Sequence, residues 1–179
     1  SNTDDLPIIG CSDIAINPHN SQIMYLATGD ANGVGSQLTI ASIGILKSTD
    51  GGITWPPNSN TMNWEVSWGR NIYKLLIHPT NPDTVYAATT NGVYRTINAG
   101  TNWIKINDGQ FTDIEFKPGN PNTIYAAAGV HSGGSFYKSI DAGLTFTQIT
   151  DNLPASNTVA RFEIGVTPVI EVPTMDGSV

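Results

Sequence analysis

Short runs rich in β-branched and aromatic residues alternate with clusters of Gly, Pro, Asn and Asp along the chain. Such runs predict β-strands, and no stretch carries a convincing helical period. In the middle of the chain the predicted strands are Ile72–Ile77, Thr84–Thr89, Gly92–Thr96 and Trp103–Ile106. The next four are Thr112–Phe116, Thr123–Ala128, Ser135–Ser139 and Thr145–Thr150. The pattern therefore predicts an all-β fold.

One motif occurs three times: an apolar residue, any residue and Pro, with Tyr seven positions after the Pro. The pairs are Pro18 and Tyr25, Pro79 and Tyr86, and Pro118 and Tyr125. Pro fixes φ and Asn tolerates a tight backbone, so the Asn-containing segment after each Pro predicts a turn between two strands. Small residues follow each Tyr.

A second motif follows each Tyr: a hydroxyl residue, any residue, Asp or Asn, any residue, Gly, two further residues and an aromatic. Its members are Ser48, Asp50, Gly52 and Trp55; Thr96, Asn98, Gly100 and Trp103; and Ser139, Asp141, Gly143 and Phe146. A short Asp or Asn side chain accepts backbone N–H groups within a tight turn, and Gly permits φ > 0. The aromatic anchors the returning strand. We interpret these residues as structural hairpin corners and not as catalytic groups.

The corners begin at Ser48, Thr96 and Ser139. They define units of about 40–50 residues with four short strands each, which is typical of a β-propeller blade. The predicted blades are residues 12–70, 71–110 and 111–158, and residues 159–179 begin a fourth whose first strand is Arg161–Thr167. Closed propellers have about 4–8 blades. We therefore expect the remainder of a larger propeller, or a second copy, to cover the open sheet faces and edges.

The amino-acid composition limits the kinds of partner that we expect the chain to bind. The chain of 179 residues is 39% apolar and 13% charged, which indicates one folded domain. A formal net charge of −7 argues against nucleic acid and anionic membrane surfaces as partners. No apolar run approaches the roughly 18 residues of a membrane span, so no membrane insertion is expected. Cys11 has no second cysteine to pair with, and we expect a small, buried or half-buried thiol.

The corner motifs resemble the Asp-box, or BNR, repeat of sialidases, xyloglucanase-type glycoside hydrolases, sortilin-type propellers and photosystem assembly propellers. The segments Tyr25–Asp30 and Gly44–Gly52 are similar to those of sortilin-like repeat proteins secreted by Bacteroidetes bacteria, and the resemblance covers residues 12–150. It implies a propeller fold and a secreted or cell-surface bacterial protein. The repeat is shared by enzymes and non-enzymes, so it implies no activity. Arg95 repeats the position of Lys47 and Lys138, which argues against the arginine triad that sialidases need.

The first repeat holds a long Gly-rich insertion. Tyr25 and Ser48 are 23 residues apart, against 10 and 14 in the other repeats. Xyloglucanase-type hydrolases place a catalytic Asp shortly after a similar strand, so the resemblance makes Asp30 the candidate acid. Its partner carboxylate would lie outside this chain. Asp30 and Asn32 also resemble the start of a calcium loop, but no acid follows where the bidentate ligand belongs. An Asx-rich turn explains the same residues.

A second insertion carries Trp64, Trp68 and Arg70. Exposed Trp rings stack on sugars, and Arg binds hydroxyls or carboxylates, which would suit a glycan site. The two Trp residues are four apart, so in a strand they share one face and would equally pack into the core, the interpretation we favour. The histidines and the lone Cys have no metal-ligand spacing, so no metal site is assigned.

These patterns favour a non-catalytic propeller segment that binds glycan or protein through its loops. The alternative is a fragment of a glycoside hydrolase whose second acid lies elsewhere.

Overall fold

The computed structural model describes residues 10–30, 41–56, 59–67, 70–130, 132–159 and 162–168. Twelve strands of this part form three four-stranded antiparallel sheets, as the sequence predicts. The first sheet has the order β1 (Cys11–Ile16), β2 (Met24–Thr28), β3 (Ser42–Ser48) and β4 (Asn60–Ser67). The second runs β5 (Ile72–Ile77), β6 (Val85–Thr89), β7 (Gly92–Thr96) and β8 (Ile104–Asn107). The third runs β9 (Phe111–Lys117), β10 (Asn120–Val130), β11 (Ser132–Ser139) and β12 (Thr147–Ile149).

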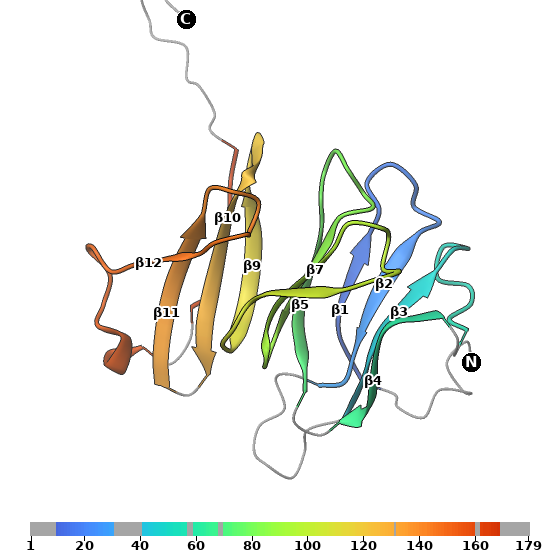
Figure 1. Cartoon of the computed structure of the whole chain (residues 1–179), viewed down its shortest axis with the longest axis horizontal. Helices are drawn as coiled ribbons and strands as arrows, with labels where there is room; N and C mark the ends of the chain where they lie inside the picture. Colours follow the sequence, from blue (N-terminus) through green and yellow to red (C-terminus); the bar gives the residue numbers. More distant parts are fainter. Residues whose placement is uncertain are drawn as a thin grey trace, which may run out of the picture.

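The sheets follow one another in chain order, with the second between the other two (Figure 1). β1 contacts β5, and β5 contacts β9, so the first strand of every sheet lies on the same side of the arc. This arrangement is an arc of a β-propeller, with β1, β5 and β9 as the inner strands. The fold class predicted from the sequence is confirmed.

The core consists of layers between successive sheets. Alternate residues of β6 face opposite neighbours, because successive side chains of a strand point to opposite faces. Val85 and Ala87 pack toward the first sheet, and Tyr86 and Ala88 pack toward the third. Every residue of β6 is buried. β6 therefore has no free face, which explains its nearly continuous apolar sequence.

Two local expectations are wrong. Residues 162–168, which include most of the strand expected at Arg161–Thr167, form no strand in the described part of the chain. No further strand is described beside them, so the ladder that would define a strand is missing. Cys11 is exposed and not buried, because it opens the inner edge strand of the first sheet.

Candidate functional site

A groove of about 340 Å³ crosses the three inner strands. Its walls combine charged side chains from each strand, namely Asp13, Lys74 and Glu115, with aliphatic side chains of β1 and β5. The aliphatic part includes Ile14 and Ile16, which are 49% and 50% exposed. Among the described residues, no aromatic side chain lines the groove. An exposed apolar strip beside charged groups is typical of a surface that binds a partner.

Lys74 is the cation of the groove, and carboxylates surround it. Its Nζ lies 3.3 Å from Oε1 of Glu115. Burial alone would lower the pKa of Lys74, but Glu115, Asp13 and Asp113 outweigh burial and raise it. Burial raises the pKa of Glu115, and the neighbouring Asp113 and Asp13 raise it further against the pull of Lys74. The groove therefore holds more negative than positive charge.

Two aspartates of the inner strands accept backbone amides from the segment that follows their own blade. Leu75 donates its amide to Oδ2 of Asp13 at 2.6 Å, and Ile164 donates its amide to Oδ2 of Asp113 at 2.7 Å. Asp13 and Asp113 both stand five residues before the Pro of their repeat. Lys74 occupies this position in the second blade, where Glu115 pairs with it. The position thus joins each of the three blades to the part of the chain that follows it.

The corner residues form closed hydrogen-bond networks. Ser48 donates its hydroxyl to Oδ1 of Asp50 at 2.7 Å, and Thr54 donates its amide and hydroxyl to the same carboxylate at 2.9 and 2.6 Å. The bonds from Thr54, followed by that from Ser48, lower the pKa of Asp50 to about 2. Asp141 has the same partners in its repeat, and its pKa is also lowered to about 2.

The other corner positions also serve the turn. The amides of Gly52, Gly100 and Gly143 donate to the hydroxyls of Ser48, Thr96 and Ser139 at 2.9, 3.0 and 2.9 Å. Asn98 accepts the hydroxyl of Thr96 and the amide of Asn102. The aromatics Trp55, Trp103 and Phe146 belong to the apolar clusters. The corner carboxylates are therefore engaged in hydrogen bonds that hold the turns.

The ligand candidates from the two insertions do not gather at the groove. Asp30 is half-buried beyond the end of β2, and Arg70 is exposed before β5. Trp64 is only 7% exposed and packs edge-on against Tyr94, with ring centroids 6.2 Å apart, so its ring faces lie within the core. Asn32 and Trp68 lie outside the described residues. Among the described residues, no group of His, Cys, Asp and Glu side chains is arranged to hold a metal ion.

Sequence reasoning missed Asp13, Lys74 and Glu115. A signal was present, because the position five residues before the Pro is charged in every repeat: Asp13, Lys74, Asp113 and Glu163. Lys74 and Asp113 lie within the predicted strands Ile72–Ile77 and Thr112–Phe116, so the charge that recurs at one position of these strands was the available signal.

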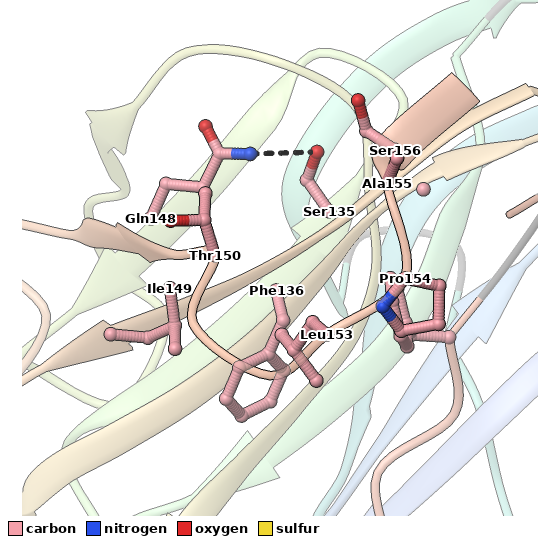
Figure 2. Close-up of a pocket in the computed structure, with 11 residues that line it drawn as sticks. Ser135, Phe136, Gln148, Ile149, Thr150, Leu153, Pro154, Ala155 and Ser156 are labelled. Atoms are coloured by element: carbon pink, nitrogen blue, oxygen red, sulfur yellow. Dashed lines mark hydrogen bonds between the residues drawn. The ribbon is translucent and has the colours of Figure 1, made fainter. Parts of the chain in front are cut away.

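A second cavity, of about 90 Å³, lies on the outward face of the third sheet (Figure 2). Phe136 and Ile149 of the sheet line it together with Leu153, Pro154 and Phe162, which follow β12. The amide of Gly134 donates to the carbonyl of Val159 at 2.9 Å and ties the segment after β12 to β11. The cavity is much smaller than the ~300 Å³ of a small ligand site, so it is a packing gap.

Comparisons with known proteins agree with the fold. An ancestral GH74 enzyme has a TM-score of 0.59 and 20% identity, with 86% of this chain and 20% of that chain covered. A GH74 enzyme from Niastella koreensis has a TM-score of 0.58 and 26% identity, with 79% and 23% covered. YCF48 bound to D1 peptide has a TM-score of 0.57 and 16% identity, with 84% and 44% covered. The chain thus spans less than half the length of these structures.

No family model matches the chain, and no curated protein does. No helix in the described residues is long and apolar enough to cross a membrane. The fold and its neighbours define the chain as part of a β-propeller related in structure to GH74 xyloglucanases and to YCF48.

Proposed function

We propose that this chain is a non-catalytic binding segment of a propeller, and that the groove over β1, β5 and β9 takes an extended peptide with basic and apolar side chains. The observation that carries the proposal is the make-up of the groove. Ile14 and Ile16 provide exposed aliphatic surface, and Asp13 and Glu115 outnumber Lys74 as charges.

The same make-up favours a peptide over a glycan. Glycan sites use aromatic faces for stacking on sugar rings, and the part of the chain that the structure describes supplies none to this groove. Aliphatic pockets beside carboxylates suit peptide side chains, and extended peptides commonly lie along strands. YCF48, a structural neighbour, has been solved bound to the D1 peptide. The resemblance to secreted sortilin-like repeat proteins supports a place outside the bacterial cell.

Binding is tested by fluorescence anisotropy with a labelled peptide of alternating Ile and Lys. We expect binding that weakens as salt rises, and no binding of the matched Ile and Glu peptide. Glu115→Gln should weaken the Ile–Lys peptide about fivefold, the effect of about 1 kcal/mol. The exposed Asp151→Asn is the matched control and should leave binding unchanged. Equal binding of both peptides, or equal effects of both variants, would exclude the proposal.

Glycoside hydrolysis is the second candidate, favoured by the similarity to GH74 enzymes. Glycosidases need two carboxylates, one of them with a raised pKa. Glu115 has a raised pKa and lies among Asp13 and Asp113, while the sequence points to Asp30. Release of reducing ends from xyloglucan, lost in Asp30→Asn or in Glu115→Gln, would establish this function in place of the first. Xyloglucan left intact by the wild-type chain would leave the peptide proposal standing.

A further inference from the structure

A cavity of about 400 Å³ lies between the first and second blades, separate from the groove over the inner strands. One wall consists of residues from β3, β4 and the segment that joins them, and the other is the corner between β7 and β8. Its volume falls within the ~300–1,000 Å³ of sites that bind small molecules. The cavity is therefore large enough for a ligand.

The insertion after the first corner builds one wall of this cavity. β4 begins five residues after the aromatic of its corner, Trp55, whereas β8 begins directly after Trp103. Ser59 and Thr61 of the insertion line the cavity. Thr61 lies against the second corner, because a Cβ on Gly100 would be 2.8 Å from its own Cβ. The insertion thus has a place in the structure to which the groove over the inner strands gives no role.

The corner residues that line the cavity differ from their counterparts in the other corners. The second and sixth residues of the three corners hold equivalent positions in the repeat. Four of these six are aliphatic, are between 55% and 74% exposed, and lie outside the cavity: Ile53, Ile97, Ile140 and Leu144. The other two, Thr49 and Thr101, line it. Hydroxyls thus replace aliphatic side chains at the two positions that line the cavity, which indicates a polar occupant.

Lys47 gives the cavity a positive charge. Its Nζ donates to the carbonyl of Ala99 at 2.9 Å and lies 5.4 Å from the centroid of the Tyr25 ring, and both of these partners are neutral. Burial lowers the pKa of Lys47, and Asp83 offsets only part of this effect. No acidic side chain is found among the described residues that line the cavity. The cavity therefore favours an anion, in a chain whose formal net charge is −7.

The hydrogen bonds already made leave the lining groups with defined roles. An ammonium group has three N–H donors, and Lys47 uses one of them on the corner carbonyl, so two remain for ligand oxygens. Thr61 donates its hydroxyl to the carbonyl of Ile45 at 3.2 Å, and Thr101 donates its hydroxyl to that of Asn98 at 2.9 Å. Both threonine oxygens are then acceptors. A ligand that matches the whole set carries a carboxylate for Lys47 and hydroxyls for the threonines.

We propose that this cavity binds a small polyhydroxy carboxylate, such as a hexuronic or aldonic acid, with the carboxylate at Lys47 and hydroxyls at Thr61 and Thr101. Aromatic side chains are absent from the described residues of the lining, so polar contacts alone hold the ligand. This suits a single charged unit better than a neutral oligosaccharide, which depends on stacking. The site shares no described residue with the peptide groove, so each can be tested without the other.

The test is a titration of the ¹⁵N-labelled chain, followed by NMR at constant ionic strength. We expect glucuronate to shift the amide signals of residues 59–61 and 99–101, with a dissociation constant of about 1 mM. Glucose lacks the carboxylate and acetate lacks the hydroxyls, so each should bind at least tenfold more weakly. Equal binding of glucose or acetate, shifts confined to other residues, or no shift with glucuronate overturns the proposal.

Variants test the two halves of the site separately. Thr49→Val combined with Thr101→Val replaces hydroxyls by methyls, as the other corners do, and should weaken glucuronate at least fivefold. Ile97→Thr makes the converse exchange at a corner position outside the cavity and should leave binding unchanged. Lys47→Met should lose binding, whereas Lys47→Arg keeps the charge that Arg95 supplies at the same repeat position and should bind within about threefold of the wild type. Wild-type affinity in the threonine variant or in Lys47→Met overturns the proposal.

Discussion

Tyr25 and Tyr86 occupy the same repeat position, yet the structure predicts opposite consequences when each loses its hydroxyl. The Tyr86 hydroxyl donates to the carbonyl of Ala142 in the next blade at 2.9 Å. The Tyr25 hydroxyl is buried and has no hydrogen-bond partner among the described residues. Burial, with a contribution from Asp83, raises the pKa of Tyr25 to about 12. The two tyrosines are therefore a matched pair, one whose hydroxyl makes a hydrogen bond and one whose hydroxyl makes none with the described residues.

We expect Tyr86→Phe to destabilise the chain by about 1 kcal/mol, the net value of one hydrogen bond. The loss should not reach the ~3 kcal/mol of an orphaned buried group, because Arg95 still donates to the same carbonyl at 3.3 Å. For a domain of this size the change corresponds to a fall in Tm of about 2–4 °C. Tyr25→Phe removes a buried hydroxyl without a partner, so its Tm should stay the same or rise.

Thermal and urea unfolding of the wild type, the two single variants and the double variant measure this difference. The double variant should equal the sum of the singles, because the two positions lie at different interfaces. Destabilisation by Tyr25→Phe equal to or greater than that by Tyr86→Phe would refute the reasoning.

The corners supply two further predictions. The lowered pKa values of Asp50 and Asp141, about 2 against 3.8, give stability that is present above pH 4 and lost as pH falls toward 2. The Asp50→Asn and Asp141→Asn double variant should therefore show a smaller fall in Tm between pH 4.5 and 2.5. Gly100→Ala should cost about 2–3 kcal/mol, because φ is +88° and its Cβ would lie 2.8 Å from that of Thr61 in the preceding blade. Gly119→Ala, with φ +74° and open space, should cost only about 1 kcal/mol in the same unfolding experiment; equal losses would contradict the steric argument.

The strands could be predicted where turn chemistry bounds them. Ile72–Ile77 and Gly92–Thr96 match β5 and β7 residue for residue, because Pro, Asn and Gly stand at their ends. β10 extends to Asn120–Val130 and β12 shrinks to Thr147–Ile149, against predictions of Thr123–Ala128 and Thr145–Thr150. The ends of these strands depend on pairing with the neighbouring strands. The residue pattern along a single strand does not contain this information.

The groove could be predicted only in part. The sequence shows a charge before each Pro, but not that Lys74 meets a glutamate two residues along in the next repeat. That contact depends on the stacking of two sheets. Ligand-binding residues were predicted in the insertions because function concentrates in loops. In the structure, however, Trp64 is packed between sheets. Exposure of Cys11 follows from its place on an edge strand, which composition does not reveal.

The inner strand of the first blade belongs to two surfaces at once. Ile14 and Ile16 line the groove, and they also match residues that a preceding blade covers in the other repeats. At the position of Ile14 the other two repeats hold Leu75 and Ile114, which are 3% and 0% exposed. Among the described blades, the first therefore offers the apolar surface at this position, and the proposed peptide binding depends on it.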